Sequence, residues 1–313
     1  MGKVCVGVDV GGTTVKLGLF EVDGQLMDKW EIPTRTEDGA KHILPDIAES
    51  VKAKLAEKNI DLAEVVGAGM GIPGPVLANG MVTQCVNLGW KEKNAQKELS
   101  ELLGVPVKSG NDANVAALGE MWQGGGKGFH DIVMVTLGTG VGGGVIIDEK
   151  IVAGRHGLGG EIGHIHVRDE ETEACNCGGV GCLEQVASAT GIAREARRKM
   201  ASVDTPSVLR EKGDSVTAKD VLDAAKAGDA LADEVAETAA RYLGLVLGQV
   251  ALTVDPEAFV IGGGVSRAGQ FLVDKIDKYY QKYTVISKNK GIITLAKLGN
   301  DAGIYGAARM VLD

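Results

Sequence analysis

The sequence lacks any apolar run approaching the roughly 20 residues that a membrane span requires. Its start, Met1-Gly2-Lys3 before a short apolar run, is not a secretory signal, and Val6 stands where a myristoylation motif needs Ser or Thr. Positive charge is also scarce, since 33 Lys and Arg face 42 Asp and Glu and leave a formal charge of −9. Nucleic-acid binding needs clustered Lys and Arg. We therefore expect a cytoplasmic protein whose partners are neither membranes nor nucleic acids.

Aromatic residues make up only 4 % of the chain, and the five cysteines are an odd number. Three of them, Cys175, Cys177 and Cys182, fall within eight residues, a spacing that favours metal binding over disulfides. Glycine is abundant, with 46 residues or about twice the usual frequency. Such a density indicates tight turns or backbone that approaches a ligand closely. At 313 residues and 44 % hydrophobic, the chain predicts about two globular domains.

A strand, a glycine turn and a second strand occur twice. The first copy has apolar residues 4–8, a turn over 9–14 and a strand over 15–20, with a hairpin turn at Asp23-Gly24. The second has a strand over 132–137, a turn from Gly138 to Gly144 and a strand over 145–147. A third apolar run ends in Gly262-Gly263-Gly264. Backbone N–H groups in such turns can cradle phosphates.

Two familiar nucleotide motifs are excluded by their context. Gly138, Gly140 and Gly143 have the spacing of a dinucleotide turn, but an apolar strand follows where that motif opens a helix. Gly126-Lys127 is followed by Gly128 instead of Ser or Thr, so it is not a Walker A loop. Helical periodicity predicts helices over 44–58, 115–122, 218–254 and 302–312, and an apolar run predicts a strand over 65–70.

Asn111-Asp112-Ala113-Asn114 lies between a predicted strand and a predicted helix. Asn111, Asp112 and Asn114 each suit the N-cap position of that helix. A carboxylate there also suits general-base chemistry, in which it deprotonates an attacking hydroxyl. The residues alone leave both roles open.

The three clustered cysteines and one histidine would form a Cys₃His set, which suits a closed tetrahedral Zn²⁺ site. Reduced free thiols in a loop are the alternative. If 162–167 is a strand, His164 and His166 lie on the same face, and spacing does not choose between them. The acidic run Asp169-Glu170-Glu171 predicts a solvated turn.

These motifs, spread over nearly the whole chain, resemble those of the ROK family within the sugar kinase/actin/Hsp70 superfamily. They occupy 9–16, 71–74, 110–114, 137–142, 160–164, 175–184 and 261–264. Asn87-Leu88-Gly89-Trp90 and the helix with Gly119 and Glu120 further resemble the ROK glucokinases of Gram-positive bacteria. The resemblance implies a two-lobed α/β fold of the actin-like ATPase (ribonuclease H-like) type, with duplicated β-glycine-turn-β hairpins. Its small lobe would comprise 1–109 plus 299–313, and its large lobe 110–298.

The resemblance also implies an activity, a transferase of carbohydrate metabolism. The enzyme would move the γ-phosphoryl group of ATP, bound with Mg²⁺, to the 6-hydroxyl of glucose, and would form a homodimer with a structural Zn²⁺. A kinase for mannose, fructose or N-acetylmannosamine stays open, as does polyphosphate as the donor. A sugar-sensing ROK regulator would need a helix-turn-helix before Asp9, where the sequence leaves no room for one. An actin-like filament protein would leave the cysteine set unexplained.

Individual residues take their expected roles from the same resemblance. Asp112 is the catalytic base, and Asp9 helps to hold Mg²⁺. The residues expected to bind the sugar are Gly71, Asn87, Asn111, Asp112, Glu161, His164 and Glu184. Those expected to bind ATP are Asp9, Gly11, Gly12, Thr13, Lys16, Thr139, Gly140, Gly262, Gly263 and Gly264. The expected zinc ligands are His164, Cys175, Cys177 and Cys182.

Overall fold

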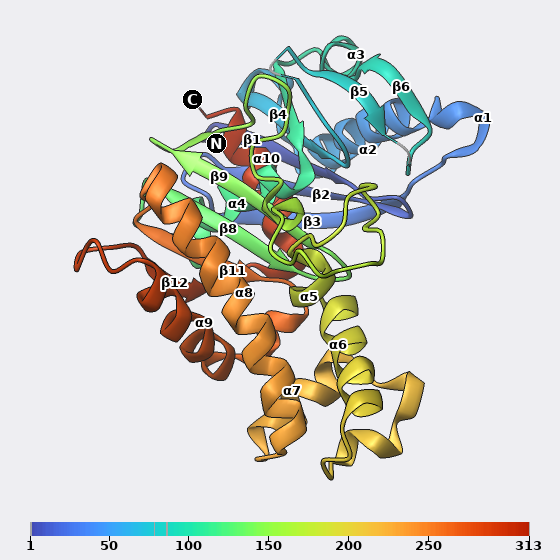
Figure 1. Ribbon diagram of the computed structural model, residues 1–313. Helices are drawn as coiled ribbons and strands as arrows, with labels where there is room; N and C mark the ends of the chain where they lie inside the picture. Colours follow the sequence, from blue (N-terminus) through green and yellow to red (C-terminus); the bar gives the residue numbers. More distant parts are fainter. Residues whose placement is uncertain (1, 78, 86, 313) are drawn as a thin grey trace. The chain divides into compact units, whose positions relative to one another are not determined.

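The computed structural model describes residues 2–77, 79–85 and 87–312 (Figure 1). These residues divide into two compact units. The first unit contains Met1–Asp131, Gly144–Gly160 and Leu298–Asp313, and the second contains Ile132–Gly143 and Glu161–Lys297. The lobes predicted from the sequence differ from these units at 110–131, 144–160 and 298. That the two predicted lobes close over a substrate stays a prediction.

The first unit is built on a five-stranded sheet with the order β3-β2-β1-β4-β7. The three N-terminal strands form an antiparallel meander, with the predicted turn at Asp23-Gly24 between β2 and β3, while β4 and β7 run parallel to β1. The strands are β1 Val4–Val10, β2 Thr14–Glu21, β3 Leu26–Pro33, β4 Val65–Ile72 and β7 Val107–Asn111, and a separate hairpin comprises β5 Met81–Cys85 and β6 Trp90–Asn94.

Helices cover this sheet because their apolar residues recur at helical spacing. In α2 (Ile43–Glu57), for example, Ile47, Val51 and Leu55 are buried in one core with the strands. The last helix returns to the first unit and packs on β1 and β4 (Figure 1). The other helices of this unit are α1 Glu37–Ala40, α3 Ala95–Leu103, α4 Asp112–Gln123 and α10 Ala302–Met310.

The second five-stranded sheet has the order β10-β9-β8-β11-β12, the same pattern as the first when its strands are numbered along the chain. This repeat matches the duplicated strand-turn-strand pattern of the sequence. The strands are β8 Ile132–Leu137, β9 Val141–Ile147, β10 Lys150–Ile151, β11 Ala258–Gly262 and β12 Ile292–Leu295. The helices of the second unit are α5 Glu184–Ala187, α6 Ala189–Ser202, α7 Ala218–Lys226, α8 Ala230–Val254 and α9 Gln270–Tyr283.

Two predicted elements differ from the structure. The single helix over 218–254 is wrong, because Gly228 adopts φ 91° and Asp229 caps a new helix by accepting a hydrogen bond from Ala232 N. The predicted turn from Gly138 to Gly144 is too long, since β9 already begins at Val141. A Cβ on Gly144 would lie 2.6 Å from Ala117 Cβ, so this glycine allows α4 to pack closely on the strand.

None of the helices described is both long and apolar enough to cross a bilayer.

Candidate active site

The strand register of the first sheet brings the predicted phosphate turn and the Asn-Asp pair to one edge. Asp9 on β1 pairs with Gly71 on β4, and Gly71 pairs with Gly110 on β7. All three strands are parallel, and their carboxyl ends meet there. Asp112 follows directly on β7, so two carboxylates from opposite ends of the first 112 residues share this edge. Ligands of α/β sheets commonly bind beyond such carboxyl ends.

Asn111, and not Asp112, caps helix α4. Its side-chain oxygen accepts hydrogen bonds from Ala113 N at 3.0 Å and Asn114 N at 3.2 Å, and its amide nitrogen donates to Gly74 O at 3.1 Å. Asp112 Oδ1 accepts from Ala113 N and from the Asn111 amide, both within the same turn. Because Asn111 fills the cap, the helix does not need the Asp112 carboxylate for its start. The competing structural role for Asp112 is therefore weakened.

Asp9 has a carboxyl group that ionises with difficulty. Burial, and then the negative charge of Asp112, raise its pKa to about 6, while the charge of Lys16 lowers it. Lys16 Nζ is already engaged, because it donates to Asn300 O at 3.0 Å. The turn beside Asp9 is closed by a hydrogen bond from Gly11 N to Thr14 O, which leaves Gly12 and Thr13 exposed at its tip. Asn87, which follows β5, is also exposed.

In the second unit, the corresponding turn is Gly138-Thr139-Gly140, with Thr139 exposed. The glycine run after β11 lies against the end of β8, since a Cβ on Gly263 would come within 2.5 Å of Leu137 O. Gly263 also adopts φ 83°, so only glycine fits both the conformation and the contact. Two of the predicted ATP elements are thus neighbours in one unit.

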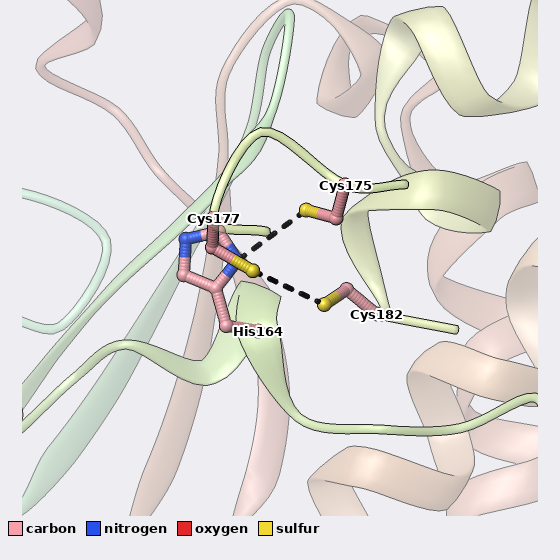
Figure 2. A group of neighbouring side chains, drawn as sticks. All are labelled: His164, Cys175, Cys177 and Cys182. Atoms are coloured by element: carbon pink, nitrogen blue, oxygen red, sulfur yellow. Dashed lines mark hydrogen bonds between the residues drawn. The ribbon is translucent and has the colours of Figure 1, made fainter. Parts of the chain in front are cut away.

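The three clustered cysteines and His164 converge in the second unit (Figure 2). Their candidate ligand atoms all lie within 4.8 Å of one another. Cys177 Sγ lies 3.7 Å from Cys182 Sγ, and Cys175 Sγ lies 3.7 Å from His164 Nδ1. A tetrahedral zinc ion with metal–sulfur bonds of about 2.3 Å has sulfur–sulfur edges of about 3.8 Å. The donor set therefore fits Zn²⁺, and these two distances are close to such an edge.

The thiols of the cluster differ in how readily they lose the proton that metal binding displaces. Burial raises the pKa of the Cys175 thiol to about 12, and burial also raises the pKa of Cys182. The exposed Cys177 has a lowered pKa, because the Gly179 backbone donates a hydrogen bond to its sulfur. A bound cation would displace the thiol protons, as metal binding to cysteine generally does.

Glu184 lies between the cysteine cluster and the glycine turn of the same unit. Its Oε1 accepts from Cys175 Sγ at 2.8 Å, and its Oε2 accepts from Val141 N at 3.4 Å. His164 Nδ1 faces the thiols, while Nε2 lies 3.9 Å from Glu161 Oε2. The structure thus gathers Glu161, His164 and Glu184, the three predicted sugar-binding residues of this unit.

The His166 ring is not part of the cluster, although the His166 backbone forms a β-bridge with Cys182. Residues 162–164 form a 3₁₀ helix, so the strand considered over 162–167 is wrong, and the two histidines do not share a strand face. The His166 ring instead bonds Val180 O and Asp169 Oδ1, each at 2.8 Å. Sequence spacing left open whether His164 or His166 joins the cysteines, and the structure places His164 beside them.

An arginine–glutamate network behind the cysteine loop was not predicted. Glu171, expected in a solvated turn, is buried, and its carboxylate accepts from Arg194 and Arg198 of α6 and from the backbone N–H of Thr172 and Glu173. These contacts, with Arg198 first, lower the pKa of Glu171 to about 2 despite its burial. The signal in the sequence was an acidic run before a helix with arginines three and four residues apart.

A second unpredicted contact set ties the cysteine loop to α5. Gln185 Oε1 accepts from Cys182 N at 3.1 Å, and Gln185 Nε2 donates to Glu173 O at 2.9 Å. Gln185 directly follows Glu184, so the residue that anchors the loop is adjacent to a predicted sugar ligand. Nothing in its sequence context distinguished it from an ordinary helical glutamine.

Comparison with known proteins shows which family has this sequence and fold. The family model described as "ROK family" matches residues 5–313. The chain belongs to the ROK family. It is 43 % identical over 310 residues to a glucokinase of Halalkalibacterium halodurans, with 98 % of this chain and 94 % of that protein covered.

Two solved structures of the family are similar over nearly the whole chain. A ROK hexokinase from Thermus thermophilus has a TM-score of 0.81 at 30 % identity, covering 98 % of this chain and 97 % of the other. A ROK glucokinase from Streptomyces griseus, in complex with glucose and AMPPNP, has a TM-score of 0.72 at 32 % identity, covering 98 % of both chains. The predicted family and the predicted actin-like fold class are confirmed.

Proposed function

We propose that this ROK protein is a glucokinase, which transfers the γ-phosphoryl group of ATP to the 6-hydroxyl of glucose and releases glucose 6-phosphate and ADP. The observation that carries the proposal is the 43 % identity to a glucokinase across 98 % of the chain. The sheet edge with Asp9 and Asp112 and the cluster of Glu161, His164 and Glu184 provide the residues that such chemistry needs.

Asp112 is the proposed general base. Its carboxylate orients the 6-hydroxyl and accepts the hydroxyl proton as the oxygen attacks the γ-phosphorus. Asn111 supports this role by capping α4, which fixes the backbone of the residue that follows it. A cation held by Asp9 would relieve the charge repulsion between Asp9 and Asp112.

The remaining predicted residues divide between the sugar and the nucleotide. Glucose offers only hydroxyl groups, so a selective site needs several fixed donors and acceptors. Glu161 and Glu184 accept from hydroxyls, and His164 Nε2 faces away from the thiols and is available to the sugar. The proposed further sugar residues are Asn87, Asn111 and Gly71, and the proposed ATP residues are Gly11, Gly12, Thr13, Lys16, Thr139, Gly140, Gly262, Gly263 and Gly264.

Two metal ions complete the proposal. Asp9 presents a hard carboxylate oxygen of the kind that Mg²⁺ prefers, and Mg²⁺ bound with ATP would neutralise charge on the transferring phosphate. His164 Nδ1 and the three thiolates would hold Zn²⁺, which would fix the loop that carries the sugar residues. ATP as the donor supports the proposed cytoplasmic location. A homodimer stays a prediction.

A coupled assay across hexoses and phosphoryl donors tests the function. We expect the highest kcat/KM with glucose and ATP, and at least about a hundredfold loss of kcat in Asp112→Asn. Mannose, fructose and N-acetylmannosamine serve as alternative acceptors, and inorganic polyphosphate as the alternative donor. A preference for another hexose would reassign the substrate, and absence of any phosphorylation would overturn the proposed kinase activity.

A further inference from the structure

A cavity of about 270 Å³ lies within the second unit, between the glycine turn after β8 and helix α6. Thr139 and Gly140 line it from the turn, and Thr190, Gly191 and Arg197 line it from the helix. Two direct contacts join these walls: Ala189 N donates to Gly138 O at 2.8 Å, and the Thr190 hydroxyl donates to Thr139 O. The first turn of α6 is thereby fixed to the predicted phosphate turn.

Helix α6 has four cationic residues, and three of them are neutralised. Arg194 and Arg198 pair with Glu171 and Glu173, and Lys199 pairs with Glu234. Arg197 is the exception, because within the described parts of the chain it has neither a hydrogen-bond partner nor an ion-pair partner. It is nevertheless half-buried and lines the cavity. A guanidinium in this position offers several N–H donors to an anionic ligand.

Helix geometry directs this cation toward the glycine turn. Thr190 and Arg197 are seven residues apart, so they lie on nearly the same face of α6, about 10 Å apart along its axis. Long side chains in a helix point back toward its N-terminus, which brings the Arg197 guanidinium toward Thr190. The cavity thus has hydroxyl and backbone groups and the Glu184 carboxylate near the turn, and the guanidinium groups of Arg194 and the unpaired Arg197 on the helix. That arrangement suits an extended ligand with several negative charges.

We infer that Arg197 binds the phosphate chain of the nucleotide and sets the affinity for the phosphoryl donor. The inference rests on the proposed function, which supplies the nucleotide. Because the protein has a net charge of −9, attraction of ATP must come from local positive groups of this kind. Arg197 stands outside the glycine motifs, so it adds a cationic side-chain contact from α6 to the backbone and hydroxyl groups of the turn at 138–140.

Steady-state kinetics of Arg197→Ala provides the first test. A lost charge-assisted hydrogen bond predicts a KM for ATP raised about tenfold, with kcat and the KM for glucose within about twofold of wild type. Arg197→Lys should recover part of the loss, because it restores the charge without the fork of donors. The matched control is Lys199→Ala, which removes one cation from the same helix and should leave the KM for ATP unchanged.

Calorimetric titration separates this inference from the proposed function. Arg197→Ala should bind ADP about tenfold more weakly than wild type and adenosine equally well. Equal losses of affinity for ADP and adenosine would reassign the contact to the nucleoside and overturn the phosphate assignment. Unchanged ADP affinity would also overturn it, because Arg197 would then make no contact with the nucleotide. A wild-type protein that binds ADP but phosphorylates no hexose would overturn the proposed function alone, and the titrations would still decide the role of Arg197.

Discussion

Asp9 and Asp112 lie at the same edge of the first sheet, where burial and the charge of Asp112 raise the pKa of Asp9 to about 6. Neither carboxylate serves as the cap of helix α4, because Asn111 does. We therefore propose that the two carboxylates act as a functional pair. In this proposal Asp9 serves the cation that accompanies ATP, and Asp112 serves the proton of the attacking hydroxyl.

Asp112→Asn tests the proposed role of Asp112 as the general base. The variant keeps side-chain size and leaves the Asn111 cap intact, so we expect unchanged thermal stability and glucose affinity within a few-fold. Loss of the base should lower kcat by about 10²-fold or more. Stopped-time assays at saturating glucose and ATP measure kcat, and calorimetry measures the glucose affinity. A kcat within about threefold of wild type would rule out Asp112 as the base.

Metal content tests the cysteine cluster. We expect one zinc ion per chain in protein purified without added metal, measured by mass spectrometry of the metal. Cys177→Ser should lose it, because serine is a poor ligand for zinc in a set of thiolates. Cys5→Ala is the matched control, since Cys5 is a buried thiol of β1 outside the cluster. Zinc-free protein with full activity would refute a structural role for the ion.

Coupling between the cluster and the sugar is tested at His164. If Nδ1 binds zinc and Nε2 binds the sugar, His164→Ala and removal of zinc by a chelator should each weaken glucose binding by more than about tenfold. Binding of an ATP analogue should change much less. His166→Ala is the control, since His166 bonds Val180 and Asp169 instead of the thiols. Equal losses for both ligands would indicate general unfolding instead of coupling.

Glu171 should make stability depend on pH. Its pKa is lowered to about 2 from an ordinary value of 4.5, so its stabilising effect is complete above pH 4.5 and disappears as the pH falls toward 2. Glu171→Gln should lower the free energy of unfolding at pH 7 by about 3 kcal/mol, because the partly buried Arg194 and Arg198 lose the fully buried carboxylate that pairs with them. Urea unfolding at several pH values measures this difference, which should shrink toward pH 2.

The exposed neighbour Glu170 provides the control for that series. Glu170→Gln removes the same charge from the same loop without touching the arginines, and we expect little change in unfolding free energy at any pH. A Glu171→Gln effect that persists unchanged at pH 2 would mean that packing, and not the charge of Glu171, stabilises the loop.

Local patterns predicted much of the fold because they report on short-range preferences. The strand over 132–137 was located to the residue, and the helix over 44–58 to within one residue at each end. Errors arose where a distant segment decides the conformation. Gly144 lies in β9 instead of a turn, and α4 packs closely against it there, a contact that no local pattern reveals.

The sequence by itself determined which chemistry is present: three crowded thiols beside histidines, an Asn-Asp pair after a strand, and repeated glycine turns. These depend only on residue types and short spacings. The tertiary structure decided which groups meet. A 3₁₀ turn at 162–164 gives His164 and not His166 to the thiols, and strand register brings Asp112 to Asp9. Glutamates of the cysteine loop neutralise Arg194 and Arg198 but not Arg197, because pairing depends on where separate segments lie in space.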